Sequence, residues 1–173
     1  MRAFTTVFGC FIVLLLASAS CKNTTSTADR YDFLNDPTTP NDTLFVNIER
    51  GACFGRCPIY KINVYQSGLV EYEAIKWNEE QGLFKGQLSE EKMKAIADRA
   101  KAIDYFSMED EYDSSSVTDL PATYSEVNAY GNKKRIKNRY MGPKELGDFE
   151  KFIELQFEDM IWKPWHPSGQ GNY

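Results

Sequence analysis

Cys53 and Cys57 are the residues of this chain whose types and spacing most directly suggest chemistry. They lie in the segment Cys-Phe-Gly-Arg-Cys-Pro, with three residues between them. In an oxidising compartment such a pair is expected to form a disulfide. The bond closes so small a loop that it removes only about 2 kcal/mol of unfolded-chain entropy. The predicted role of the disulfide is therefore to fix a local turn.

A thiol–disulfide redox centre is the alternative interpretation of the same two cysteines. Arg56, which lies between them, would then stabilise a thiolate. Redox proteins usually place a C-x-x-C motif at the N-terminus of a helix. Here the spacing is one residue longer, and a strand is expected to follow. A structural disulfide is the preferred hypothesis, and redox chemistry stays open.

The other polar residues form no conventional catalytic or metal-binding pattern. The chain has one histidine, His166, which is too few for a zinc site with four N or S ligands or for a histidine-based triad. Residues 109–113, with Asp119 beyond them, would offer oxygen ligands to calcium but lack the order of a calcium-binding loop. We expect a solvated acidic loop there, with calcium as the alternative. The sequence predicts no catalytic residue, no metal site and no cofactor.

The first 21 residues resemble a lipoprotein export signal. Arg2 precedes an apolar run at residues 7–17, and three small residues then lead directly to Cys21. The apolar run is shorter than the ~20 residues of a membrane-spanning helix. We therefore predict a signal peptide at residues 1–20 and an acylated Cys21 that holds the chain on a lipid bilayer. A plain secretory signal is the alternative.

This export signal places the protein in the cell envelope, and we expect the outer membrane, on its periplasmic or surface face. After Cys21, residues 21–42 are rich in Thr, Asn, Asp, Ser and Pro and are predicted to be a flexible tether. Residues 43–165 are expected to form a single domain, and residues 166–173 a disordered tail. The formal net charge is −5 and no basic tail is present, which argues against nucleic acid as a partner.

Alternating apolar residues predict three strands in the first half of the domain. The alternation begins near Leu44, Tyr60 and Val70, and Ser67-Gly68 is typical of a hairpin turn. A helix is predicted to follow Ser89, a favourable N-cap residue. Its apolar stripe consists of Met93, Ile96, Ala97, Ala100 and Ile103.

A further hairpin is predicted with its turn at residues 130–133. Val127 would face Ile136 in the core. The pairs on the solvent face would be Glu126 with Lys137 and Tyr124 with Arg139. The second strand carries a basic stripe, formed by Lys133, Arg135, Lys137 and Arg139. The preferred interpretation is an exposed face balanced by Glu126, Glu71 and Glu73, and the alternative is a docking surface for an acidic partner or anionic lipid.

A final helix is predicted to begin at Pro143 and to be stopped by Pro164. Its apolar stripe consists of Leu146, Phe149, Ile153, Phe157 and Met160. The resulting order is β-β-β-α-β-β-α. This order predicts an α+β fold, with an antiparallel sheet of about five strands and two helices packed on one face.

The segment Cys53-Phe54-Gly55-Arg56-Cys57-Pro58-x-Tyr60, the hairpin at residues 67–72 and the Thr-Asp-Leu-Pro segment at residues 118–121 resemble a known family. It is an uncharacterised domain-of-unknown-function family of Gram-negative bacterial lipoproteins with a C-F-G-x-C-P-x-Y motif. The similarity spans about residues 44–162, and Ser67 stands where Asp would be expected. The resemblance implies an architecture and an envelope address, and it implies no catalytic residues.

Together these features favour a non-enzymatic, membrane-anchored binding or structural module of the cell envelope. Its contacts with an unknown envelope protein or ligand are expected at Phe54, Arg56 and Asp119, in the turn 53–58 and the loop 113–121. A redox protein that uses the two cysteines and an inhibitor of an envelope enzyme are the alternatives.

Overall fold

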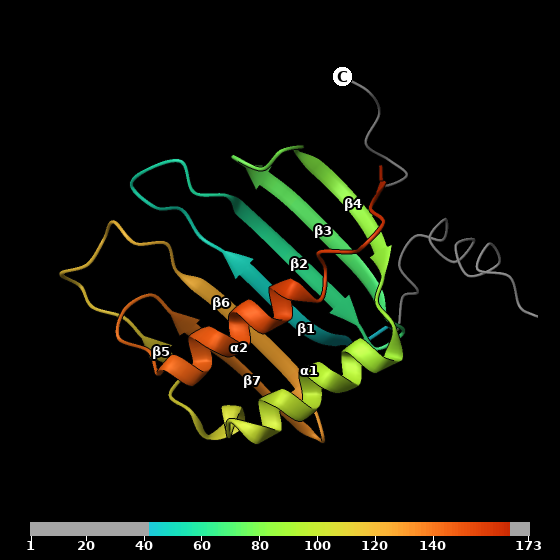
Figure 1. Ribbon diagram of the computed structural model, residues 1–173. Coiled ribbons are helices and arrows are strands. Elements are labelled where there is room, and N and C mark those ends of the chain that lie inside the picture. The colour runs from blue at the N-terminus through green and yellow to red at the C-terminus, as the bar shows by residue number, and fades with distance from the viewer. Residues whose placement is uncertain (1–41, 167–173) are drawn as a thin grey trace, which may run out of the picture.

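The protein contains one sheet of eight strands, ordered β5-β7-β6-β1-β2-β3-β4-β8 (Figure 1). Its central strands form because apolar and polar side chains alternate along them, so that one face of the sheet can be buried. The computed structural model describes residues 42–166. The predicted signal peptide, Cys21 and nearly all of the predicted tether and tail lie outside the described residues.

The strands are β1 (Leu44–Arg50), β2 (Ile59–Tyr65), β3 (Leu69–Lys76), β4 (Gly82–Gln87), β5 (Glu111–Tyr112), β6 (Thr123–Ala129), β7 (Asn132–Asn138) and β8 (Lys163–Pro164). The helices are α1 (Glu90–Ala102), the 3-10 helix η2 (Tyr105–Ser107) and α2 (Lys144–Leu155).

The α+β class and the two helices are confirmed, and the antiparallel sheet of about five strands is confirmed in part, because the five predicted strands pair antiparallel but belong to a larger sheet. The structure adds β4, β5 and β8, and β5 pairs with β7 in parallel. The β4 segment carries glycines at its first and fifth positions and no regular alternation, so the period-two pattern does not reveal it. The strands β5 and β8 have two residues each and form only by pairing with an existing sheet edge.

Both helices lie across the same face of the sheet (Figure 1). Ser89 is the N-cap of α1, as predicted, and its hydroxyl accepts a hydrogen bond from the backbone N–H of Lys92 at 3.3 Å. The predicted stripe of α1 turns inward, with Ile96, Ala97 and Ala100 buried. The core between the helices and the sheet contains Val46, Ile48, Ile62, Val64, Val70, Tyr105, Val127, Ile136, Leu146, Phe149 and Ile153.

The prediction that α2 continues to Pro164 is wrong, because the helix ends at Leu155. The N–H groups of Gln156 and Phe157 bond to carbonyls three residues earlier, at 3.1 and 3.0 Å, so the last turn tightens and the α-helical ladder stops. The chain then runs to the edge of β4, where β8 pairs with it. Phe157 nevertheless stays buried, as its place on the stripe predicts.

The β6–β7 hairpin is confirmed, but its predicted register is shifted by two residues. Its loop is Tyr130-Gly131, and both residues have positive φ angles, 53° and 74°, as a type I′ turn requires. The observed partners are Val127 with Lys134, Ser125 with Ile136, Glu126 with Arg135 and Tyr124 with Lys137. Because the shift is an even number of residues, each side chain keeps its predicted face.

The sheet has two ends of different character. The entry end comprises residues 42–43 and the tight turns 66–68 and 130–131, where the N–H of Gln66 bonds to the carbonyl of Thr43 at 2.9 Å. The disulfide end comprises the loops 51–58, 77–81, 113–122 and 139–143, which gather at the left and top of Figure 1.

Candidate functional site

The disulfide loop joins β1 to β2 and is closed by the bond between Cys53 and Cys57, whose Cα atoms are 5.9 Å apart. The backbone N–H of Phe54 donates to the carbonyl of Asp119 at 3.2 Å, and the N–H of Gly51 donates to the carbonyl of Ala122 at 2.8 Å. These bonds place the turn 53–58 beside the loop 113–121, the two segments in which the sequence predicts a binding site.

The three predicted contact residues point to different parts of this surface. Phe54 is 93% exposed, and its backbone bond to Asp119 places these two residues together. The guanidinium of Arg56 instead lies over the ring of Trp77, 5.0 Å from its centroid. Trp77 belongs to the β3–β4 loop and is a contact that the sequence analysis missed.

An ion-pair clamp fastens the disulfide loop to α2. Arg50, just before the loop, donates from Nε and Nη2 to the two carboxylate oxygens of Glu154, at 2.7 and 2.9 Å. The hydroxyl of Tyr60, just after the loop, donates to the same carboxylate. Burial raises the pKa of Tyr60, and the hydrogen bond to Glu154 adds to that effect. The tyrosine of the C-F-G-x-C-P-x-Y motif therefore helps to hold the loop on the helix.

Glu150 lies one turn earlier on α2 and is only 3% exposed. Its carboxylate accepts a hydrogen bond from Asn138 Nδ2 at 2.9 Å and lies 3.5 Å from the hydroxyl of Ser125. Burial raises the pKa of Glu150 to about 7. Both glutamates occupy positions that continue the apolar stripe of α2, and an acid at such a position is the sequence signal that would have identified them.

An aromatic groove of about 450 Å³ lies on the disulfide end, beside the disulfide loop. It is lined by Pro58, Tyr72, Trp77, Asn78, Glu79, Glu80, Phe84 and Trp162. The ring of Tyr72 is central, with its centroid 5.8 Å from that of Phe84 and 5.0 Å from that of Trp162. The groove is not predictable from the local sequence patterns, because these reveal neither β4 nor the return of the chain to the sheet edge after α2.

The β3–β4 loop holds Trp77 in an uncommon conformation. Its φ angle is 62°, in the left-handed region that a bulky residue rarely adopts. Asn78 fixes the loop by donating to the carbonyl of Ile59 at 2.8 Å and by accepting from the hydroxyl of Tyr72 at 3.2 Å. Such a conformation costs on the order of 1–3 kcal/mol and persists only where the surroundings enforce it.

The predicted basic stripe lies on the face of the sheet away from the helices and is neutralised within the protein, as the preferred interpretation expects. Only Glu126 is a predicted partner, and Glu71 and Glu73 do not pair with the stripe. The pairs are Lys133 with Glu126 (3.0 Å), Arg135 with Glu49 (3.3 Å) and Glu126 (3.8 Å), Lys137 with Glu111 (2.8 Å) and Asp113 (2.5 Å), and Arg139 with Asp113 (3.6 Å).

The acidic run at residues 109–113 therefore supplies counter-ions to β7. Its carboxylates at Asp110, Glu111 and Asp113 all pair with cations of that strand or of the residue following it. Within residues 42–166, no three or more His, Cys, Asp or Glu side chains are grouped so as to hold a metal ion. Calcium binding at this loop would have to displace these ion pairs.

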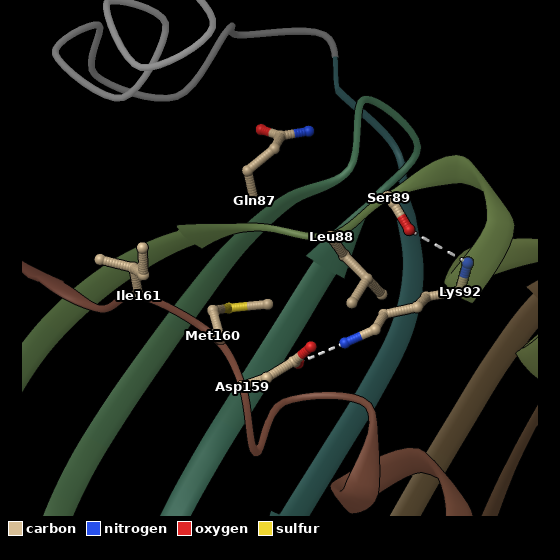
Figure 2. A pocket seen from close by; sticks show the side chains of 7 residues that line it. All are labelled: Gln87, Leu88, Ser89, Lys92, Asp159, Met160 and Ile161. Atoms are coloured by element: carbon tan, nitrogen blue, oxygen red, sulfur yellow. Dashed lines mark hydrogen bonds and ion pairs between the residues drawn. The ribbon is translucent and has the colours of Figure 1, made fainter. Parts of the chain in front are cut away.

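A second hollow, of about 280 Å³, lies at the entry end (Figure 2). The ammonium of Lys92 points across it to the carboxylate of Asp159 and also donates to the carbonyl of Gln156 at 2.9 Å (Figure 2). The polar side chains at this hollow already have partners within the protein, because Lys92 pairs with Asp159, Ser89 caps α1, and the Gln87 amide donates to the carbonyl of Ser67 at 3.0 Å. The aromatic groove and the loops around it are the better candidate site.

Large apolar side chains are exposed mainly at the disulfide end. Among the residues that the structure describes, those on this end are Phe54, Ile75, Trp77, Leu120, Tyr140 and Met141. Three others are exposed elsewhere, namely Tyr130, Leu155 and Ile161. Such clustering of apolar surface is typical of interaction sites.

The fold and this surface define a small α+β domain with one open sheet, a helical layer and a disulfide-closed loop beside an aromatic groove. The chain belongs to the DUF6438 family, a domain of unknown function, whose sequence profile matches residues 44–156. No curated protein and no solved structure matches the chain significantly. Among the described residues, no helix is long and apolar enough to cross a membrane.

Proposed function

We propose that the protein is a lipid-anchored binding module of the cell envelope that engages another envelope component through its disulfide end. The observation that carries the proposal is the clustering of exposed aromatic and apolar side chains on the loops of that end. Aromatic residues, Met and Arg are the residue types enriched in protein interfaces, and this surface offers Phe54, Trp77, Met141 and Arg56.

The position of the chain entry supports this arrangement. Asp42 and Thr43 contact the turn 66–68, at the end of the sheet opposite the disulfide loop. A tether from an acylated Cys21 would attach at the entry end and leave the disulfide end accessible to a partner. The signal peptide, the acylation of Cys21 and the outer-membrane location are parts of this proposal.

The contacts that hold the loops of the disulfide end in place favour a rigid binding surface. The clamp from Arg50 and Tyr60 to Glu154 and the backbone bond from Phe54 to Asp119 fix the loops before any partner arrives. A preorganised surface loses less conformational entropy on binding than a flexible one. No step in this proposal requires a catalytic residue.

A capture experiment with matched variants tests the proposal. The full chain and a triple variant, Phe54→Ala with Arg56→Ala and Asp119→Ala, are used to capture partners from envelope extracts. Removal of an aromatic, a cationic and an anionic contact should reduce recovery of the specific partner by about tenfold or more.

The entry end offers a control of the same chemistry. Lys101 lies 5.5 Å from the ring centroid of Tyr130, whose hydroxyl donates to Asp98. The variant with Asp98→Ala, Lys101→Ala and Tyr130→Ala should capture as much partner as the wild type. Equal capture by the wild type and both variants would refute a binding site at the disulfide end.

A further inference from the structure

The lining of the aromatic groove includes acidic side chains but no basic side chain of the described residues. Glu79 and Glu80 are both exposed and both line it, and no lining residue is basic. Neither glutamate belongs to an ion pair formed within residues 42–166. Burial, followed by the charge of Glu79, raises the pKa of Tyr72. The rim of the groove therefore carries two carboxylates that are not paired with a cation of the described residues.

Four aromatic side chains line the groove, and the face of an aromatic ring attracts cations. Tyr72, Phe84 and Trp162 form one aromatic cluster, and Trp77 stands at the opening, 42% exposed. The protein already places two of its own cations on Trp77, with Arg56 and Lys76 at 5.0 and 5.1 Å from the ring centroid. Such contacts contribute about 0.5–1 kcal/mol at exposed sites and more where water is excluded.

We propose that this groove receives an arginine side chain of the partner protein, with the guanidinium stacked on the aromatic rings and paired with Glu79 or Glu80. The inference rests on the proposed function in one respect, which is that a partner protein docks at the disulfide end. It adds the chemistry by which the partner is recognised.

Arginine fits this lining better than lysine or a neutral group. A guanidinium is planar, so it can stack on an indole or phenol ring while its N–H groups form two parallel hydrogen bonds to a carboxylate. It is also more weakly hydrated than an ammonium, which lowers the cost of entering an aromatic groove. A neutral ligand would use the rings and leave both carboxylates without a counter-ion.

The three tryptophans of the chain provide a direct test. Trp77 and Trp162 line the groove, whereas Trp165 contacts Lys85, 3.8 Å from its ring centroid, and does not line it. The indole N–H signals of the ¹⁵N-labelled full chain are followed by NMR during titration with acetyl-Arg-Arg-Arg-amide. We expect the signals of Trp77 and Trp162 to shift and saturate, and that of Trp165 to stay in place.

Two comparison peptides test whether recognition requires the charge and the planar shape of the guanidinium. The tri-citrulline peptide has almost the same shape without charge and should cause no saturable shift. The tri-lysine peptide should bind several-fold more weakly. Equal binding of the citrulline peptide would overturn the inference, because it would identify stacking of a neutral group as the basis of recognition.

Two double variants with the same change in net charge test whether binding depends on the rim. Glu79→Gln with Glu80→Gln should weaken binding of the arginine peptide by about tenfold, since both charge-assisted bonds are lost. The control, Glu90→Gln with Glu91→Gln on α1, changes the net charge equally and should bind like the wild type. Equal weakening by both variants would overturn the inference, because it would show attraction to the overall charge only.

The outcomes separate this inference from the proposed function. If the arginine peptide leaves the groove signals unchanged while the Phe54, Arg56 and Asp119 variant still loses its partner, the groove inference fails and the proposed function stands. If the peptide binds the groove but capture is unaffected by that triple variant, the proposed function fails.

Discussion

At the entry end the strands are joined by tight turns and the polar side chains around them pair with one another, whereas at the disulfide end longer loops expose large apolar side chains. Ser67 bonds to Asp42, Tyr130 to Asp98 and Lys92 to Asp159 at the entry end. The disulfide end also has polar groups beneath its surface, namely the partly buried clamp and the buried Glu150. The exposed apolar side chains of the disulfide end are therefore supported by polar contacts that are buried or partly buried beneath them.

Removal of the clamp is expected to destabilise the disulfide end more than any other single change proposed here. Glu154→Ala leaves the partly buried Arg50 without its bidentate partner and Tyr60 without its acceptor. Loss of one member of a buried ion pair costs about 3–5 kcal/mol, and partial exposure places this case near the lower limit. We expect the free energy of unfolding in urea to fall by about 3 kcal/mol.

The matched change at the entry end is Asp159→Ala, which removes the carboxylate partner of Lys92 from an exposed pair. Exposed ion pairs contribute little, so the midpoint of unfolding should stay within error of the wild type. Equal destabilisation by the two variants would show that the disulfide end is not specially supported.

The buried acid beneath the disulfide end predicts a pH dependence. The pKa of Glu150 is raised by burial from 4.5 to about 7, so between these values the folded protein holds a proton that the unfolded chain has released. The stability that this group contributes is full below pH 4.5 and is lost as the pH rises through about 7. The shift corresponds to at most about 3 kcal/mol.

Glu150→Gln cannot ionise and keeps the shape of the side chain. Its free energy of unfolding, relative to that of the wild type, should therefore increase by up to about 3 kcal/mol between about pH 4.5 and pH 8. Urea unfolding at a series of pH values measures this difference. A difference that stays constant with pH would contradict the assignment, and Glu90→Gln on the exposed face of α1 is the control.

Gly68 in the tight turn and Gly55 in the disulfide loop differ in their tolerance of a side chain. At the entry end Gly68 has a φ of 83°, and an added Cβ would lie 2.6 Å from the carbonyl oxygen of Leu88. At the disulfide end an added Cβ on Gly55 would meet nothing closer than 3.9 Å. Thermal unfolding should show a loss of about 2 kcal/mol for Gly68→Ala and almost none for Gly55→Ala. The reverse order would contradict the assignment of the tight turn to the entry end.

The sequence predicts the parts of the fold that depend on local patterns. Alternation identifies β1, β2, β3, β6 and β7, and the Ser89 cap and the apolar stripe identify α1. The strands β5 and β8 have no pattern of their own, because each exists only through pairing with a distant edge.

The candidate site is less predictable because its parts are distant in sequence. Arg50 and Glu154 are separated by 104 residues, and no local spacing joins them. The disulfide loop and its neighbour were predictable, since their turn residues and cysteines stand out in the sequence. The aromatic groove was not, because it needs Trp162 to return to the sheet beside Tyr72.

The smallest expected effect concerns the disulfide itself. Because the clamp and the backbone bonds to residues 119 and 122 also hold the loop, the variant Cys53→Ala with Cys57→Ala should lose no more than about 2 kcal/mol of unfolding free energy. Thiol trapping of the full chain in glutathione buffers should find the bond oxidised down to about −300 mV, as for a structural disulfide. Phe54→Ala, in the same loop, should leave both the free energy of unfolding and the reduction potential of the disulfide unchanged. Ready exchange near −200 mV would instead support the redox alternative, because catalytic disulfides have potentials in that range.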